Sequence, residues 1–294
     1  MSFLFDKNLL RRLCVAFCLA FFCNISATPA NAADTEVISL RAVEASLAKI
    51  VLDWNPPVAE AGSVTDYVVS LRYAGIQKTL VFDDGVHSES GITISDFPLG
   101  TALKFSVTAM FGKTKGAATK IRVDAQMPPS ATGLTKPVVR QMRYIREHFS
   151  DKTADKWGYI PKNNCANFAS QTLAARGLKQ SNLWHNQLGS TWNISRTWVS
   201  STALSGYLRS LKGSKQLSYS QRELVKVGDL AFFDWDSSGD RDHSAIVTAV
   251  VRSEAETKIF YASHTAHGRF QSVVLATSVL HPGGKVYFVH PGRN

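Results

Sequence analysis

Short stretches in which apolar and polar residues alternate dominate the first part of the chain. In residues 46–54, Leu52 and Trp54 alternate with polar neighbours until Pro56 and Pro57 end the strand. Further strands are predicted at residues 67–73, 79–82, 91–94, 103–110 and 120–123. Turn residues separate these strands at the spacing of a small β-sandwich. The pattern therefore predicts an all-β domain over residues 33–126.

After a Pro-rich stretch, apolar residues recur at helical spacing instead. Residues 127–136 are small and Pro-rich, which is typical of a short, semi-rigid linker. Pro137 suits the first turn of a helix. The residues expected to face the core of that helix are Val138, Met142, Ile145 and Phe149. The change of period predicts a second domain over residues 137–294.

A second predicted helix carries the most informative residue, Cys165. Asn163 or Asn164 can cap this helix, and Gly177 ends it, so Cys165 falls in its first turn. There the helix dipole and free amide groups favour a thiolate and can stabilise an oxyanion. A cysteine packed as a small hydrophobic residue is the alternative. The polar flank formed by Asn163 and Asn164 argues against it.

The first 32 residues have the pattern of an export signal. A basic start precedes an apolar run at residues 13–25 that is too short to span a membrane, and residues 30–32 supply a cleavage site. A membrane anchor is the less favoured alternative. We expect a secreted or cell-wall-associated bacterial protein that begins near Ala33, without stable membrane insertion. Cys165 is then the one cysteine left, so it is either inert or a nucleophile.

Charge is divided unevenly between the two predicted domains. Residues 33–128 carry a net charge of −2, whereas residues 129–294 carry +10. A basic exported domain suits an anionic surface or polymer. We expect no nucleic-acid partner, because no recognised nucleic-acid motif accompanies the charge. Peptidoglycan or another anionic cell-wall polymer is the expected partner.

Two histidines are the best candidates to assist a thiolate. His243 begins an apolar, β-branched strand directly after a polar loop, which places its imidazole at a rim. His264 ends the next predicted strand, which starts at Lys258. In a hairpin centred near residues 253–254, His243 and His264 would face one another, so that His264 could orient His243. A polar residue without function at the strand end is the alternative for His264.

Two other features each allow two interpretations. The acidic loop Asp234–Asp242 matches the first positions of an EF-hand calcium loop, but Ala245 stands where that loop needs glutamate. We expect a solvated acidic loop there, with no metal site. Trp184, Trp192 and Trp198 would either line a groove for sugar or peptide or fill the core.

The first domain contains a series of short motifs, namely Trp54-Asn55-Pro56-Pro57, Tyr67 and Phe97-Pro98-Leu99-Gly100-Thr101. This series resembles the fibronectin type III family over about residues 36–125. Leu103 departs from the pattern, because that family usually has a tyrosine there at the corner. The resemblance implies a sandwich that serves as a spacer or, less favoured, as a binding module.

The second domain carries a more specific series of motifs. They are, in order, Asn164–Gln171, Ser190-Thr191-Trp192, Gly228-Asp229, Asp242–Val247 and His264-Thr265. This order resembles the putative amidase-domain family, a branch of the papain-like cysteine peptidases related to NlpC-type and CHAP cell-wall hydrolases, over about residues 137–290. Many relatives have an acidic residue where Asn164 stands. The resemblance implies an α+β fold in which the Cys165 helix packs on an antiparallel sheet.

The resemblance also implies hydrolysis of amide bonds by a Cys-His-His set. Cys165 would attack the carbonyl, His243 would transfer the proton, and His264 would fix the imidazole. The residues expected to bind the oxyanion or substrate are Asn163, Asn164 and Trp192. No cofactor is expected.

The expected protein is therefore multidomain, with a fibronectin III-like sandwich followed by a papain-like α+β domain. Its expected activity is that of a secreted cysteine amidase or peptidase that cleaves amide bonds of bacterial peptidoglycan. The alternative is a secreted wall-binding or adhesion protein whose papain-like domain is inactive.

Overall fold

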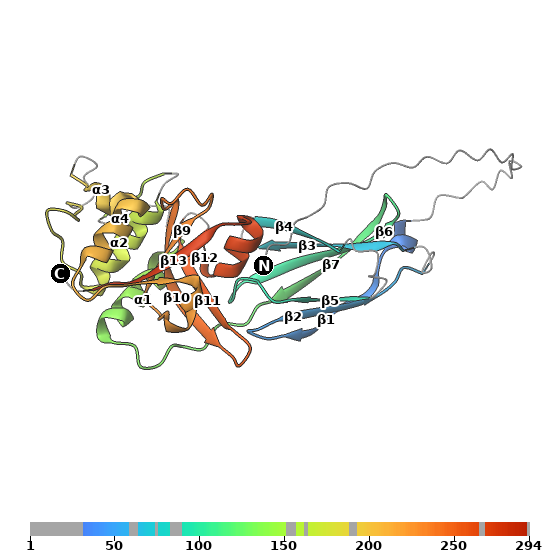
Figure 1. Cartoon of the computed structure of the whole chain (residues 1–294). Helices are drawn as coiled ribbons and strands as arrows, with labels where there is room; N and C mark the ends of the chain where they lie inside the picture. The colour runs from blue at the N-terminus through green and yellow to red at the C-terminus, as the bar shows by residue number, and fades with distance from the viewer. Residues whose placement is uncertain are drawn as a thin grey trace, which may run out of the picture.

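The protein is elongated, with a β-sandwich at one end and a helix-covered sheet at the other (Figure 1). The computed structural model describes residues 32–58, 64–73, 76–82, 90–150, 157–161, 164–187, 193–264 and 268–292. Residues 1–31 of the predicted export signal, Asn163 and Trp192 lie outside these residues, and the hypotheses about them stay predictions. Of the helices in the described ranges, none has both the length and the apolar character needed to cross a membrane.

The sandwich consists of two antiparallel sheets. Their strands are ordered β1-β2-β5 in one sheet and β4-β3-β6-β7 in the other. The strand bounds are β1 (Ile38–Ala45), β2 (Ile50–Asn55), β3 (Asp66–Tyr73), β4 (Ile76–Phe82), β5 (Gly91–Ile94), β6 (Ala102–Phe111) and β7 (Thr114–Asp124). The sequence pattern predicted the other strands but missed β1, and it began β2 four residues early.

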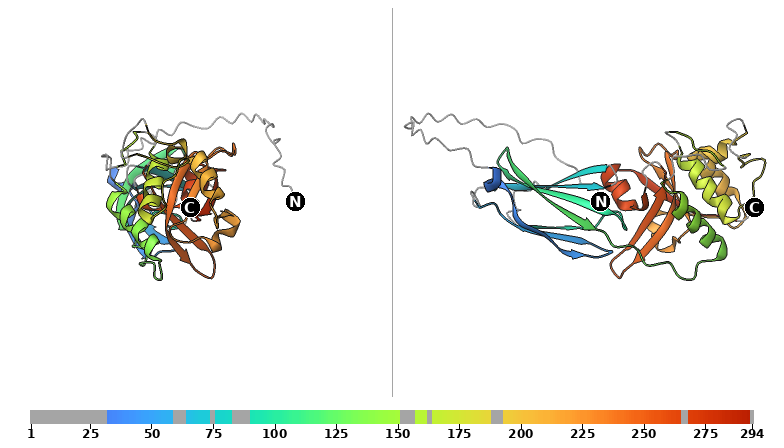
Figure 2. Two further views of the ribbon diagram at one scale, coloured as in Figure 1. Left: turned by 90° about the vertical axis from the view of Figure 1, so that its left-hand side faces the viewer. Right: turned by 180° about the vertical axis from the view of Figure 1, so that it is seen from behind.

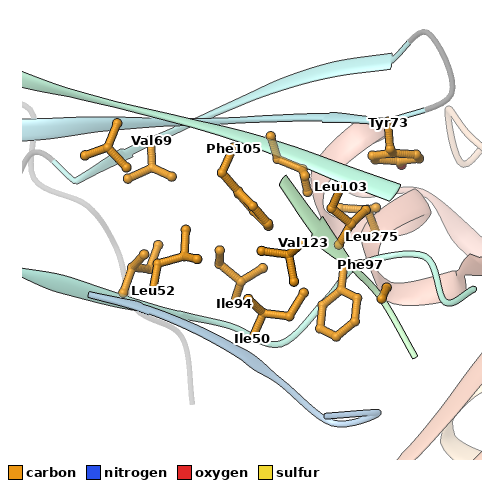
Figure 3. Packing of buried hydrophobic residues seen from close by; sticks show 14 of the residues in the cluster. Ile50, Leu52, Val69, Tyr73, Ile94, Phe97, Leu103, Phe105, Val123 and Leu275 are labelled. Carbon is orange, nitrogen blue, oxygen red and sulfur yellow. The ribbon is translucent and has the colours of Figure 1, made fainter. Parts of the chain in front are cut away.

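The apolar positions of the alternating strands meet in one core between the two sheets. Figure 3 shows Ile50 and Ile94 from one sheet, and Val69 and Phe105 from the other, in the space between the two sheets. Ile50 and Val69 are completely shielded from solvent. Burying each such side chain contributes about 1.5–3 kcal/mol, so the period-two pattern is the main determinant of this domain.

The second domain has its four α-helices on one side of a six-stranded antiparallel sheet, and the short π-helix η3 (Leu275–Leu280) on the side that faces the sandwich (Figure 2). The helices are α1 (Lys136–His148), α2 (Cys165–Arg176), α3 (Arg196–Val199) and α4 (Ser201–Ser210). The sheet order is β12-β11-β10-β9-β13-β8, with β8 (Lys215–Ser218), β9 (Leu230–Asp234), β10 (His243–Arg252), β11 (Thr257–Ser263), β12 (Gly268–Ser272) and β13 (Lys285–His290). The described chain is thus mostly β-sheet with some helices, and a papain-like topology stays a prediction.

Alternation along β9 separates the two faces of this sheet. Phe232 joins the core beneath the helices, whereas its neighbour Phe233 joins a second core on the opposite face. Helix α2 packs directly on β10 and against α1. This packing sets the first turn of α2 beside the start of β10, where the candidate site lies.

The two domains share apolar core rather than meeting only through residues 125–135. Phe260 and Leu275 belong to the same buried cluster as the sandwich core, and Figure 3 shows Leu275 among Phe97 and Leu103. The backbone amide of Leu99 donates to the carbonyl of Phe270 (3.0 Å). This shared core could not be predicted from the sequence, because each contributing residue also fits the core of its own domain.

A buried lysine adds polar contacts to the domain junction. The Lys258 ammonium donates to the carbonyls of Ala48 (2.6 Å) and Ser95 (2.7 Å), both in the sandwich. It also pairs with Glu256 at 3.1 Å. A buried ammonium is tolerated only when its donors are satisfied, so these contacts tie β11 to one end of the sandwich.

Candidate active site

Helix α2 presents Cys165 as its first residue, as the sequence predicted. Asn164 is the N-cap, although its side chain makes no capping hydrogen bond, and Gly177 ends the helix with a left-handed φ of 108°. A left-handed C-cap favours glycine, which lacks a Cβ. Residues 165–173 are all buried, and Cys165 is only 3% exposed. The helix therefore runs inside the domain, with its N-terminal turn at the candidate site.

The Cys165 thiol lies in a polar environment despite its burial. Burial alone would raise the pKa of this thiol, but a hydrogen bond with His243 and the charge of that imidazole oppose it. Hydrogen bonds from the Ser201 hydroxyl and the Ser244 backbone lower the pKa further, to about 6. The Ser201 Oγ is 3.5 Å from Sγ. Such a thiol is largely ionised at neutral pH, and the thiolate is the more reactive form of cysteine.

Ser201 and Ser244 were not singled out from the sequence. They reach the thiol from the first residue of α4 and from the second residue of β10, and Ser201 Oγ also bonds Ser244 Oγ at 3.2 Å. Serine is common at helix starts, and Ser200 caps α4 through its own side chain. Nothing in that pattern distinguishes a serine beside a thiol from an ordinary cap.

His243 is the first residue of β10, where the sequence placed it. Its backbone pairs with Phe233 of β9. Its ring is 7% exposed and lies near the rings of Phe233 (5.8 Å between centroids) and Trp235 (5.9 Å). Two aromatic rings and a sheet partner therefore restrain the imidazole beside the Cys165 thiol.

The predicted pairing of His243 with His264 is wrong. The β10–β11 hairpin exists, but a register shift between Val247 and Ala249 leaves Ile246 opposite Ala262. Extending that register outward sets Ser244, rather than His243, opposite His264. The shift moves His264 to the other face of the sheet, because successive strand residues point to opposite sides.

His264 instead contacts the residue that precedes the cysteine. Its Nδ1 is 2.5 Å from the Asn164 Nδ2, and its Nε2 is 2.6 Å from the carbonyl oxygen of His148. The ring also stacks on Phe168 of α2, with centroids 3.8 Å apart. The bonds fit the tautomer with its proton on Nε2, which donates to the carbonyl while Nδ1 accepts from the amide. His264 thus braces the start of α2.

Asn164 is the centre of a buried network. Its Oδ1 accepts from the Ile160 backbone amide (2.9 Å) and from the Asn167 side chain (2.8 Å), while its Nδ2 meets His264. These bonds use the amide to fix the cap of α2. Its predicted contact with an oxyanion or substrate stays a prediction, as do those of Asn163 and Trp192.

Two of the three tryptophans that followed the nucleophile helix are core residues. Trp184 and Trp198 are completely buried and stack with centroids 4.7 Å apart. Their indole groups donate to the Ser170 hydroxyl (3.1 Å) and the Asn167 side chain (2.7 Å). The groove interpretation is wrong for these two residues. Sequence could not separate the interpretations, since a tryptophan with a buried partner for its N–H suits either setting.

Comparisons with known proteins concern the two domains separately. A family model described as "Putative amidase domain" matches residues 138–289, which is more than half of the chain. No curated protein matches the chain.

Solved structures similar to the chain cover about a third of it. One is the fn3 domain of the human collagen alpha-1(XX) chain, with 20% identity, a TM-score of 0.28, and coverage of 33% of this chain and 90% of that one. Domains d3-d4 of the rat CD45 extracellular region are 19% identical with a TM-score of 0.26, and the match covers 30% of this chain and 47% of that one. A computationally redesigned β-sandwich is 11% identical with a TM-score of 0.27, and the match covers 32% of this chain and 97% of that one. At these TM-scores the likeness does not establish a shared fold.

Proposed function

The chain belongs to the amidase-domain family, and on that premise we propose that it cleaves amide bonds as a cysteine-dependent hydrolase. Membership supports amidase activity in general terms. The observation that favours cysteine chemistry is the Cys165 thiol at the N-terminus of α2, hydrogen-bonded to His243 and with its pKa lowered to about 6. A purely structural buried cysteine would have its pKa raised instead.

The reaction begins with attack of the Cys165 thiolate on the amide carbonyl. The bond from sulfur to carbon forms as the carbonyl π electrons move to oxygen, giving a tetrahedral oxyanion. The first amide groups of α2 precede its first internal hydrogen bond, in which Phe168 donates to Asn164, so they can donate to that oxyanion. His243, which has taken the proton of the Cys165 thiol, then protonates the leaving nitrogen as the oxyanion collapses and the carbon–nitrogen bond breaks, so that the amine departs and the acyl group stays on sulfur.

Water completes the cycle by hydrolysing the thioester. His243 takes a proton from the attacking water, the acyl–sulfur bond breaks, and Cys165 leaves as a thiolate. Ser201 and the Ser244 amide hold that thiolate between turnovers. The cycle needs no cofactor, because the nucleophile and the proton carrier are both side chains.

In this mechanism His264 is a positioning residue that acts through Asn164. The side chain of Asn164, the residue immediately before Cys165, links His264 to the backbone of Ile160. Loss of His264 would release the cap of α2 and let the thiol move relative to His243. We therefore expect a lower turnover number, with Cys165 still acting as the nucleophile.

We propose bacterial peptidoglycan as the substrate, with the protein secreted or associated with the cell wall. Support comes from the sequence: an export-signal pattern over the first 32 residues and a net charge of +10 on residues 129–294. Such a charge favours an anionic polymer. The sandwich, whose sequence resembles fibronectin type III, would then act as a spacer.

Digestion of purified peptidoglycan tests the proposal. Wild-type protein and Cys165→Ala are incubated with sacculi and with soluble muropeptides, and released fragments are identified by mass spectrometry. New amine and carboxyl ends from the wild type alone support a cysteine hydrolase and identify the bond. Equal product from Cys165→Ala excludes the thiol mechanism. Binding to sacculi without any product favours the alternative, an inactive wall-binding protein.

A further inference from the structure

Four aspartates gather on the loop between β9 and β10. Asp234, Asp236, Asp240 and Asp242 each bring one carboxylate oxygen to within 4.8 Å of the others. Three of the four are exposed, but Asp234 is 1% exposed. At these separations like charges repel strongly, so the cluster needs compensation from a positive group.

Asp234 carries an unsatisfied oxygen. Its Oδ2 accepts from the Gly239 amide (3.1 Å) and lies 3.5 Å from an Arg241 nitrogen. Its Oδ1 is buried without a hydrogen-bond partner. A buried carboxylate oxygen without a partner is costly, and an ion is one of the few groups that could satisfy it. This observation is independent of the number of acidic residues nearby.

Arg241 compensates only part of the negative charge. Its guanidinium also donates to the carbonyls of Gly239 (3.2 Å) and Asp240 (2.6 Å), and it lies over the Tyr287 ring. One guanidinium faces a cluster of four carboxyl groups. The contact of Arg241 with Asp234 is long (3.5 Å), and it involves Oδ2, which already accepts from the Gly239 amide.

We propose that this loop binds a calcium ion. All the available ligands are hard oxygen atoms, and Ca²⁺ takes six to eight of them in flexible geometry. The spacing of Asp234, Asp236, Ser238 and Asp242 follows the first, third, fifth and ninth positions of a calcium loop, and Gly239 (φ 99°) stands at the sixth, where such loops turn sharply. The sequence alone had favoured a solvated loop because of Ala245. The orphaned Asp234 oxygen reverses that preference.

The ion would hold the segment that positions His243. Asp242 directly precedes His243, and its Oδ2 accepts from the backbone amide of Trp235 (2.7 Å), whose ring lies beside the imidazole. A cation between Asp234, the last residue of β9, and Asp242, the residue before β10, would fix these ring positions. This second part rests on the proposed hydrolase function, whereas binding of the ion does not.

Terbium luminescence tests the binding directly. Tb³⁺ replaces Ca²⁺ at oxygen sites, and Trp235 within the loop can sensitise its emission. We expect a saturable signal from the full chain that Ca²⁺ displaces. Asp236→Asn combined with Asp240→Asn removes two exposed carboxylates of the cluster. This should weaken Tb³⁺ binding by at least about tenfold, because the negative charge at the site controls affinity. Asp124→Asn, on the exposed end of β7, is the matched control and should bind normally.

The outcomes separate the two parts of the proposal. No sensitised signal, or one that the double variant leaves unchanged, overturns the calcium site. If binding is confirmed, the effect of a chelator on the rate of peptidoglycan cleavage tests the link to His243. An activity that chelation leaves unchanged overturns that link. A protein that binds calcium but cleaves nothing in any condition contradicts the proposed hydrolase function and leaves the site intact.

Discussion

Replacement of His243 by alanine should move the titration of the Cys165 thiol to higher pH. In the wild type, burial raises the pKa of this thiol, and the hydrogen bond and charge of His243 are the largest opposing causes, with a net value of about 6 against a usual 9.0. Without His243, burial acts against only the Ser201 and Ser244 hydrogen bonds. We expect the pKa to rise by at least about two units.

The size of the effect determines the best readout. At pH 7 a thiol with pKa 6 is about nine-tenths ionised, whereas one at 9.0 is about one-hundredth ionised. A lower pKa also makes the thiolate less nucleophilic, by about 0.4–0.5 logarithmic units per pKa unit. Together the two effects leave only about a three- to sixfold difference in the alkylation rate at pH 7. A difference in how easily the reagent reaches the thiol would hide a difference of that size. The midpoint of the pH profile is free of that problem.

Alkylation by iodoacetamide between pH 5 and pH 10 measures this midpoint. Labelling of Cys165 is followed by peptide mass spectrometry, which separates it from the other three cysteines of the full chain. The wild-type rate should rise with pH through about 6, because the thiolate is the reactive form. In His243→Ala the rise should come at least about two units higher. The control His185→Ala changes a histidine whose ring bonds the Ser181 carbonyl, and should keep the wild-type midpoint. A midpoint near pH 6 in His243→Ala would refute the assignment of His243 as the main partner.

The remaining predictions concern stability, positioning and charge. Leu275→Ala should lower the free energy of unfolding by about 2–5 kcal/mol in a denaturant titration, since Leu275 is buried in the shared core. Separate transitions for the two domains in the wild type would contradict that core. His264→Ala should lower kcat without removing the alkylation of Cys165, and Asn164→Asp should preserve more activity than Asn164→Ala because a carboxylate can still accept from the Ile160 amide. If the basic second domain binds the wall through its charge, the fraction of protein that sediments with sacculi should fall as the salt concentration rises. A sedimenting fraction that does not change with salt would contradict electrostatic binding.

Some parts of this structure could be predicted from sequence because local chemistry determines them. The α2 boundary was one, since Gly177 adopts a left-handed conformation that favours glycine. The start of β10 at His243 was another, because a polar loop gives way there to β-branched residues. Strand β1 was missed, because its side chains are exposed or half-buried and its alternation is weak.

The contacts of His264 depended on information that the sequence does not carry. A register shift between Val247 and Ala249 changes which residues share a face of the β10–β11 hairpin. Such a shift is set by packing on both faces rather than by the residues of the turn. The network around Asn164 was equally hidden, because it joins residues far apart in the chain through side chains of ordinary composition.

The shared core also affects the order in which the chain can fold. During synthesis the sandwich strands emerge first, and Phe97 and Leu99 then lie at an end of the sandwich that still lacks its covering. Phe260 and Leu275, which complete that core, are made only after the whole of α1 to β10. The nascent sandwich therefore exposes an apolar end until late in translation. During that time a chaperone would protect this end from aggregation. A chain that stops before β11 should be degraded or insoluble even though every strand of its sandwich is present.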